Sequence, residues 1–237
     1  VLPPTRGDTA RMSATPQAIP GRAHLLQQIA SQVPESRGGD CVRVAIDGVD
    51  GSGKTTFADE LSGVLRDLGR TTIRISADDF HHVREVRHRL GRDSPEGFWL
   101  DSYDYKALAA KVLDPLGRGG SRRYRAVHHD VQSDALLSVP WQQAPPGAVL
   151  ILDGLFLHRD ELVGRWDLSI FLDVSFAATA ARMAQRDGSV PDPDDPSMRR
   201  YVEGQRIYFQ HCEPWKRASL IVNNEVLAAP TIRSRRE

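Results

Sequence analysis

One stretch of the sequence combines glycines, a lysine and a threonine at a spacing that suits phosphate chemistry. Residues 48–55 read Gly-Val-Asp-Gly-Ser-Gly-Lys-Thr and match the pattern G-x-x-x-x-G-K-[ST] in full. The glycines Gly48, Gly51 and Gly53 let backbone N–H groups turn towards phosphate oxygens, an approach that a Cβ atom would obstruct. The segment therefore predicts a loop that binds the phosphates of a nucleotide.

The side chains of this loop have predicted roles of their own. Lys54 is expected to reach the β- and γ-phosphates as a mobile positive charge, and the Thr55 hydroxyl is expected to bind Mg²⁺. The predicted nucleotide-binding segment is completed by Asp50, Ser52 and Thr56. The alternative is a chance match. The flanking sequence argues against it, because an apolar strand pattern precedes the loop and an amphipathic helix pattern follows at once.

Two aspartates follow other predicted strands. Residues 71–76 run into Asp78, and residues 148–152 run into Asp153. Because ligands collect at the carboxyl ends of strands in open parallel sheets, we expect both carboxylates beside the phosphate loop. The alternative is that each aspartate caps the next helix or turn. Phosphoryl transfer uses one carboxylate near the acceptor hydroxyl and another near the metal, and we predict Asp78 and Asp153 for these two roles.

The elements that must position these residues alternate between strands and helices. Apolar runs predict strands over residues 42–47, 71–76, 148–152, 168–174 and 220–222. Helical spacing of apolar residues predicts helices over residues 23–33, 55–68, 105–116 and 176–186. Such alternation implies right-handed crossovers and a parallel sheet covered by helices on both faces, an α/β fold. We expect a flexible leader over residues 1–22 and one domain over residues 23–237.

The composition excludes several other classes of protein. The 237 residues include 31 basic and 31 acidic side chains, and this formal charge of zero argues against a partner nucleic acid. The longest apolar run near the middle, residues 148–152, is far shorter than the roughly 20 residues that span a bilayer. The two cysteines, Cys41 and Cys212, form neither a disulfide framework nor a CxxC pair. A cytoplasmic location is therefore predicted.

Four segments occur in an order that is found in one branch of the P-loop kinases. They are residues 47–56, 76–81, 153–156 and 182–187. Over roughly residues 40–226 the chain resembles the uridine kinase and phosphoribulokinase branch. The resemblance implies a P-loop NTPase fold, with helices on both faces of a parallel sheet and a small lid over about residues 183–202. It also implies ATP and Mg²⁺ as cofactors and a small-molecule acceptor substrate.

The resemblance assigns roles to single residues. Asp78 resembles the family aspartate that accepts the proton of the sugar hydroxyl. Arg182 and Arg186 resemble lid arginines that neutralise charge on the transferring phosphoryl group, and with Lys54 and Asp78 they are the candidate catalytic residues. In the family, residues matching Asp101, Tyr124 and Gln205 lie near the ribose, the base and the nucleoside. The candidate acceptor contacts are thus Asp78, Phe80, His81, Asp101, Tyr124 and Gln205.

Several departures from the family pattern leave the acceptor open. Asp153-Gly154 stands where uridine kinases carry Glu-Gly, His81 stands in place of a tyrosine, and Ser102-Tyr103 replaces a His-Pro pair. The expected reaction is transfer of the γ-phosphoryl group of ATP to a hydroxyl, with the 5′-hydroxyl of a nucleoside as the first candidate. The alternatives are nicotinamide riboside, pantothenate, a sugar phosphate and a nucleoside monophosphate.

Two other classes of function have less support. A regulatory GTPase switch would need an Asn-Lys-x-Asp motif, and the only asparagines, Asn223 and Asn224, do not open one. A nucleotide-binding module without catalysis is disfavoured because Lys54, Thr55 and Asp78 are all present. The histidine pairs at residues 81–82 and 128–129 lack the spacing of a zinc site. The number of subunits stays open, and a homo-oligomer is included.

Overall fold

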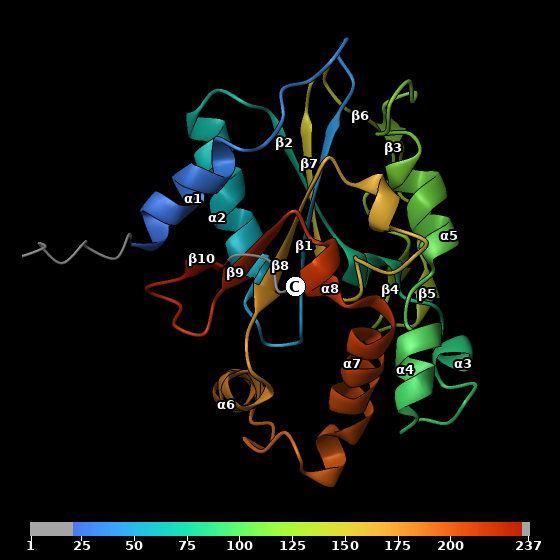
Figure 1. The fold of residues 1–237 in the computed structure, drawn as a ribbon. Coiled ribbons are helices and arrows are strands. Elements are labelled where there is room, and N and C mark those ends of the chain that lie inside the picture. Colours follow the sequence, from blue (N-terminus) through green and yellow to red (C-terminus); the bar gives the residue numbers. More distant parts are fainter. Residues whose placement is uncertain (1–20, 234–237) are drawn as a thin grey trace, which may run out of the picture.

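A six-stranded sheet runs through the middle of the molecule (Figure 1). The computed structural model describes residues 21–233. The strand order is β10-β9-β8-β1-β7-β2, and all neighbours are parallel except β10, which pairs antiparallel with β9. The strands are β1 (Val42–Gly48), β2 (Thr72–Ser76), β7 (Val149–Gly154), β8 (Leu168–Asp173), β9 (Leu220–Asn223) and β10 (Thr231–Arg233). The five predicted strands are confirmed, and β10 is an antiparallel edge strand that the sequence prediction does not include.

Alternate residues of the central strands face two separate layers of helices, as expected for a sheet that is buried on both faces. Val44 and Ile46 of β1 pack with the first layer, which contains α1 (Arg22–Ala30) and α2 (Lys54–Asp67). Ala45 of the same strand packs with the second layer, which contains α4 (Pro95–Asp101), α5 (Tyr105–Leu108) and α7 (Arg199–Cys212). Figure 1 shows α1 and α2 on one side of the sheet and α4 and α5 on the other. The α/β fold with helices on both faces is confirmed.

Shorter elements decorate this framework. Two small antiparallel ribbons join β3 to β6 and β4 to β5. The remaining elements are η1 (Ala77–Phe80), α3 (Arg84–Arg87), the π-helical turn η2 (Ala109–Leu113), β3 (Arg123–Tyr124), β4 (His129–Asp130), β5 (Ala135–Leu136), β6 (Gln142–Gln143), η3 (Val163–Arg165), α6 (Phe176–Asp187), η4 (Pro196–Met198) and α8 (Pro214–Arg217). The helix predicted over residues 105–116 is therefore α5 followed by η2. Helices α4 and α7 are absent from the sequence prediction.

The strand register brings the predicted site to one edge of the sheet. Asp47 of β1 lies beside Gly154 of β7, and Ser76 of β2 lies beside Asp153. Because these strands are parallel, the loop after β1, the turn after β2 and Asp153 meet at their carboxyl ends. The expected common edge for the phosphate loop, Asp78 and Asp153 is confirmed.

One prediction on chain organisation lies mostly outside the described residues. Of the leader predicted over residues 1–22, residues 1–20 are not described, whereas Gly21 is the N-cap of α1 and Arg22 begins that helix. The lid predicted over residues 183–202 contains the end of α6, the connection with η4 and the start of α7. Across residues 21–233, no helix has both the length and the apolar character that crossing a bilayer requires.

Candidate active site

The phosphate loop connects β1 to α2 in a tight turn. Gly51 and Gly53 have φ angles of +72° and +88°, a region that favours glycine. A Cβ atom at Gly51 would lie 2.9 Å from the carbonyl oxygen of Thr179, and one at Gly48 would lie 2.7 Å from the Ser52 hydroxyl. The packing around the loop therefore requires glycine at these positions. The strand–loop–helix arrangement that the motif needs is present.

A cavity of about 560 Å³ lies against this loop. The Lys54 ammonium donates a hydrogen bond of 2.8 Å to the carbonyl oxygen of Val49, across the loop. Because α2 begins at Lys54, the positive end of its dipole is at the same place and favours an anion there. Most of the predicted phosphate-site residues line this cavity, namely Asp50, Gly51, Gly53, Lys54, Thr55, Thr56, Asp78, Asp153, Arg182 and Arg186.

Thr55 and Asp153 are hydrogen bonded to each other within this cavity. The Thr55 hydroxyl donates to Oδ2 of Asp153 at 2.8 Å, and Arg74 donates to Oδ1 at 2.9 Å. Asp153 is buried, at the carboxyl end of β7. One hydroxyl and one carboxylate fit a Mg²⁺ ion that keeps several waters and binds substrate phosphates. Within residues 21–233 no group of three or more His, Cys, Asp or Glu side chains is placed to hold a metal ion. A Mg²⁺ ion at Thr55 and Asp153 would therefore complete its ligands with water and phosphate oxygens.

Asp78 lies at the wall between this phosphate cavity and a second cavity of about 350 Å³. The second cavity lies against the β4–β5 ribbon and is called the acceptor cavity below. Its lining residues are Asp78, Asp79, Val127, His129, Asp130, Val131 and Leu137. Among the lining residues of the two cavities, Asp78 is shared by both. Its carboxylate can therefore contact groups in either space.

Tyr103 orients the Asp78 carboxylate. The Tyr103 hydroxyl donates to Oδ1 of Asp78 at 2.9 Å. The pKa of Tyr103 lies well above its ordinary value, chiefly because the phenol is buried and also because Asp78 carries a nearby negative charge. Tyr103 is thus a phenol rather than a phenolate and remains the hydrogen-bond donor.

The neighbouring aspartate lies in a different environment. Burial raises the pKa of Asp79, and the negative charges of Asp78 and Asp153 raise it further. Asp79 lines the acceptor cavity but not the phosphate cavity. Of the two adjacent aspartates, Asp78 is thus placed between the two spaces, as the resemblance implies.

The two predicted arginines lie on α6 and line the phosphate cavity, but they are held differently. Arg182 donates to the carbonyl oxygens of Asn224 and Glu225 at 2.8 and 2.9 Å. Arg186 forms an exposed ion pair of 2.8 Å with Asp187. Arg182 is therefore tied to the segment after β9, whereas Arg186 is held by its sequence neighbour alone.

Phe80 and His81 follow Asp78 by two and three positions in the sequence. Phe80 is fully buried in the core. The His81 ring lies 4.4 Å from the Tyr103 ring, centroid to centroid, and its Nδ1 is 2.7 Å from the carbonyl oxygen of Asp78. Burial lowers the pKa of His81. Neither residue lines the two cavities, so both support the turn that presents Asp78.

Three predicted acceptor contacts are held elsewhere. Asp101 is buried and pairs with Arg89 at 2.8 Å, outside both cavities. Gln205 accepts a hydrogen bond of 2.7 Å from the backbone N–H of Asp50, so it contacts the phosphate loop. The polar groups of both residues are thus engaged within the chain, and their assignment to the acceptor stays a prediction.

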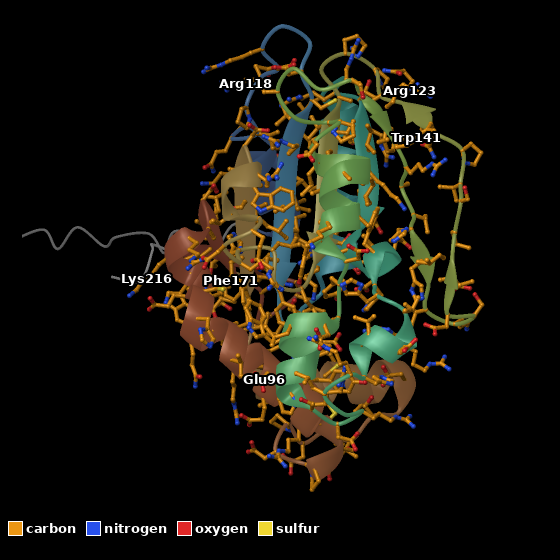
Figure 2. All side chains as sticks on the ribbon, turned by 90° about the vertical axis from the view of Figure 1, so that its right-hand side faces the viewer. Glu96, Arg118, Arg123, Trp141, Phe171 and Lys216 are labelled. Atoms are coloured by element: carbon orange, nitrogen blue, oxygen red, sulfur yellow. The ribbon has the colours of Figure 1, made fainter. Side chains whose placement is uncertain are left out.

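Tyr124, the third of these residues, lies in the β3–β6 ribbon, and its assignment to the acceptor also stays a prediction. Its hydroxyl donates to Gln142 at 2.7 Å. Burial raises the pKa of Tyr124, and the nearby Cys41, which directly precedes β1, raises it further. Tyr124 therefore lies near the amino end of β1, whereas the phosphate loop follows the carboxyl end. Figure 2 shows Arg123 and Trp141 of the ribbon region at one end of the molecule and Glu96 of α4 towards the other.

Three residues of the site are absent from the sequence prediction. Tyr103 lies in the segment after Asp101 that the resemblance already singles out, so its position could have drawn attention. His129 is buried in the wall of the acceptor cavity, where its Nε2 lies 3.1 Å from Asp134. Leu227 follows β9 and lines the phosphate cavity, and no motif marks it.

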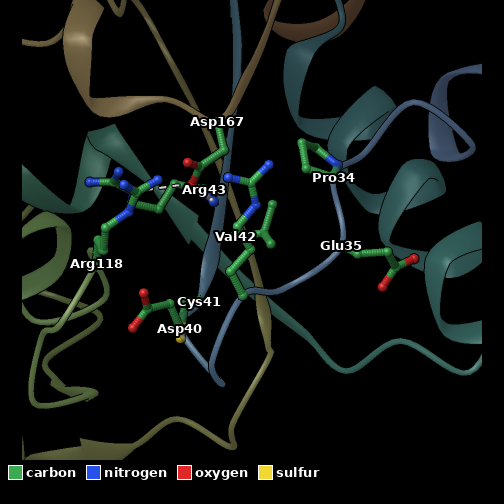
Figure 3. Close-up of a pocket in the computed structure, with 9 residues that line it drawn as sticks. Pro34, Glu35, Asp40, Cys41, Val42, Arg43, Arg118 and Asp167 are labelled. Carbon is green, nitrogen blue, oxygen red and sulfur yellow. Dashed lines mark hydrogen bonds and ion pairs between the residues drawn. The ribbon is translucent and has the colours of Figure 1, made fainter.

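A third cavity, of about 220 Å³, lies at the amino end of β1 (Figure 3). Arg43, which lines this cavity, forms an ion pair with Asp167. The Asp167 carboxylate also accepts the backbone N–H of Arg43 at 2.8 Å. The lining carries three arginines and three carboxylates, namely Arg37, Arg43, Arg118, Glu35, Asp40 and Asp167. This cavity lies at the opposite end of β1 from the phosphate loop and shares no lining residue with the two cavities above.

The parallel sheet, the phosphate loop and the carboxylates at the strand ends define a P-loop kinase. Several solved structures share this fold. A possible uridine kinase from Bacillus stearothermophilus is 20% identical, with a TM-score of 0.64, and covers 83% of this chain and 96% of its own. Phosphoribulokinase from Rhodobacter spheroides is 16% identical, with a TM-score of 0.54, and covers 78% and 71%. D-glycerate 3-kinase from Cryptococcus neoformans is 13% identical, with a TM-score of 0.51, and covers 80% and 88%.

The family is shown by the sequence itself. Residues 43–190 match the model of the phosphoribulokinase / uridine kinase family, and the chain belongs to that family. No curated protein matches the chain in sequence. The solved structures are too distant in sequence to indicate more than the fold. The resemblance to the uridine kinase and phosphoribulokinase branch is therefore confirmed, and the acceptor substrate is a separate question.

Proposed function

We propose that this kinase transfers the γ-phosphoryl group of ATP to a hydroxyl of a small acceptor that is held in the acceptor cavity. The observation that carries the proposal is the position of Asp78 at the wall shared by the phosphate and acceptor cavities. A carboxylate in this position can accept the proton of an attacking hydroxyl while the phosphates lie in the adjoining space.

The residues of the phosphate cavity have complementary roles in this proposal. Backbone N–H groups of the loop and the Lys54 ammonium bind the β- and γ-phosphates, and Arg186 adds positive charge at the open side. Thr55 and Asp153 would hold Mg²⁺, which when bound neutralises charge on the phosphate oxygens. Tyr103 keeps the Asp78 carboxylate turned towards the boundary between the cavities. Arg182 and Leu227 lie at the β9 side, where a flat, partly apolar nucleotide base would fit.

The lining of the acceptor cavity favours an uncharged, hydroxyl-rich acceptor. Three carboxylates, a histidine and three aliphatic side chains line it, and no lysine or arginine is among them. Carboxylates accept hydrogen bonds from hydroxyl groups and repel a phosphate. A nucleoside with its 5′-hydroxyl at Asp78 is therefore our first candidate. Nicotinamide riboside follows, because carboxylates attract its pyridinium cation, and pantothenate ranks below it, because they repel its carboxylate.

A phosphorylated acceptor has one observation in its favour. Arg84 and Arg87 both contact Asp134, which also lies 3.1 Å from the His129 ring in the cavity wall. Asp134 pairs with the Arg87 guanidinium at 3.4 Å, whereas it accepts the backbone N–H of Arg84, which leaves the Arg84 side chain out of this contact. A sugar phosphate or nucleoside monophosphate is therefore the second candidate. It ranks below an uncharged acceptor because Arg84 would have to turn into the cavity to bind the phosphate.

A coupled assay of ADP release tests the proposal. Purified protein is given Mg²⁺, ATP and, in turn, nucleosides, nicotinamide riboside, pantothenate, sugar phosphates and nucleoside monophosphates. We expect at least one hydroxyl-bearing acceptor to raise ADP release in the wild type but not in Lys54→Met. ADP release that no acceptor increases, or that Lys54→Met retains, would contradict the proposed function. A cytoplasmic location stays part of the proposal and is tested by fractionating cells that express the native protein.

A further inference from the structure

Helix α7 contacts the phosphate loop at two points from one face. Gln205 and Tyr208 are three residues apart, and side chains at this spacing lie on the same side of a helix. The amide oxygen of Gln205 accepts a hydrogen bond of 2.7 Å from the backbone N–H of Asp50. The hydroxyl of Tyr208 donates to the carboxylate of Asp47, the residue that precedes Gly48. Both side chains are buried.

Asp47 links the second of these contacts to the start of the loop. Its side chain is fully buried, and Oδ1 accepts the backbone N–H of Gly48 at 2.7 Å. Oδ2 accepts both the Tyr208 hydroxyl and the His158 ring, whose Nδ1 is 2.7 Å away. The backbone N–H of His158 adds a further bond of 3.2 Å. Several donors therefore compensate for the burial of this carboxylate.

The direction of the Tyr208 hydrogen bond is fixed by its surroundings. Burial raises the pKa of Tyr208 well above its ordinary value, and the charge of Asp47 raises it further. Tyr208 is therefore the donor and Asp47 the acceptor. As a result, the carboxylate is held from one side by α7 and holds the Gly48 N–H on the other.

The phosphate-binding motif alone does not require these contacts. Within the motif, the phosphate ligands are backbone N–H groups, which the glycine conformations and the helix end direct towards the phosphate. Here two backbone N–H groups at the beginning of the loop donate hydrogen bonds to side-chain oxygens. Gly48 donates to the carboxylate of Asp47, and Asp50 donates to the amide oxygen of Gln205. A loop whose amides are fixed before the nucleotide arrives pays less conformational entropy on binding.

The other end of α7 is anchored on α4 and on the segment that precedes it. The guanidinium of Arg200 donates to the carbonyl oxygens of Arg92 and Ser94 at 2.8 and 3.1 Å. Gly204 lies against α4, where a Cβ atom would be 2.7 Å from the Phe98 ring. α7 is thus wedged between the segment 87–101 and the phosphate loop, and it cannot shift without disturbing both.

We propose that Gln205 and Tyr208 are positioning residues that hold the phosphate loop in its nucleotide-binding conformation. The inference rests on the proposed function in that the bound ligand is Mg²⁺–ATP. It assigns to Gln205 a role towards the nucleotide in place of the acceptor contact expected from the resemblance. Loss of either contact lowers affinity for the nucleotide and leaves the transfer step itself intact.

Calorimetry with a nonhydrolysable ATP analogue and Mg²⁺ tests this on Gln205→Met and Tyr208→Phe. Each variant removes one hydrogen bond at nearly constant volume, and we expect the dissociation constant to rise about fivefold to tenfold, as for the loss of one such bond. The KM for ATP is expected to rise by the same factor, with kcat and the acceptor KM unchanged within about twofold. Gln210→Met, on the exposed side of the same helix, is the matched control and should bind as the wild type does.

Unfolding in urea separates positioning from a purely structural role. A structural role would lower the unfolding free energy of Gln205→Met or Tyr208→Phe and leave the dissociation constant unchanged, and this result would overturn the inference. Unchanged or tighter nucleotide binding in Gln205→Met alone would also overturn it, whatever happens to the more buried Tyr208→Phe. Wild-type protein that does not bind the analogue at all would overturn the proposed function as well, so the two failures are distinguishable.

Discussion

The hydroxyl of Tyr103 donates a hydrogen bond of 2.9 Å to the carboxylate of Asp78, the residue that lines both the phosphate cavity and the acceptor cavity. Tyr103 comes from the segment that follows α4, whereas Asp78 follows β2. Their backbones also pair nearby, since His81 and Tyr103 form an isolated antiparallel bridge. The site thus depends on a tertiary contact that holds a single carboxylate in place.

Replacing Asp78 should remove most of the turnover. Asp78→Asn cannot accept the proton of the acceptor hydroxyl, so we expect kcat to fall about 10²- to 10⁴-fold with little change in ATP affinity. The measurement is steady-state kinetics combined with calorimetry of the ATP analogue. The adjacent Asp79→Asn is the matched control. A larger loss of kcat in Asp79→Asn than in Asp78→Asn would assign the proton acceptor to Asp79.

Removing the orienting hydroxyl should have a smaller effect. Tyr103→Phe keeps the ring and its packing but loses the hydrogen bond to Asp78, and we expect kcat to fall about threefold to tenfold. Tyr105→Phe, two residues away on a ring that packs on Arg159, serves as the control and should leave kcat unchanged. Equal losses in the two variants would indicate general damage to the fold rather than orientation of Asp78.

The metal requirement should depend on Asp153. Asp153→Asn loses the negative charge that accepts from Thr55 and faces Arg74, so we expect the Mg²⁺ concentration for half-maximal rate to rise about tenfold or more. A titration of the rate with Mg²⁺ at saturating ATP provides the measurement. If the half-maximal concentration is the same as in the wild type, the metal is held without Asp153.

The stability of the protein should change with pH through Asp79. Burial and the charges of Asp78 and Asp153 raise its pKa above the ordinary 3.8. The folded state therefore binds this proton more tightly than the unfolded state does, and stability is lost as pH rises through the folded pKa. Asp79→Asn should raise the unfolding free energy at pH 7, and the gain should vanish below pH 3.8. Urea unfolding at both pH values measures it, and an unchanged or lowered free energy at pH 7 would contradict the assigned environment.

The phosphate side of the site is readable from the sequence because its parts are contiguous. The loop, the strand before it and the helix after it lie within residues 42–67. Apolar runs mark the central strands, which are buried on both faces. Asp78 and Asp153 follow such strands directly, so the shared sheet edge could be predicted for both.

The surroundings of the phosphate loop are less readable from the sequence because distant segments meet there. Gln205 and Asp50 are 155 positions apart, and sequence spacing gives no indication of their hydrogen bond. The buried face of α7 includes Gln205 and Tyr208 beside Val202, so its apolar period is interrupted and the helix is missed. Tyr124 is a similar case, since no sequence pattern marks the hydrogen bond from its hydroxyl to Gln142.

The central claim is that the loop before α2 binds the phosphates of ATP through Lys54, and calorimetry of a nonhydrolysable ATP analogue tests it most directly. The wild type should bind the analogue in a Mg²⁺-dependent manner, and Lys54→Met should bind at least about tenfold more weakly, because it loses a charged hydrogen bond to phosphate. Absence of Mg²⁺-dependent binding in the wild type, or equal affinity in Lys54→Met, would contradict the account.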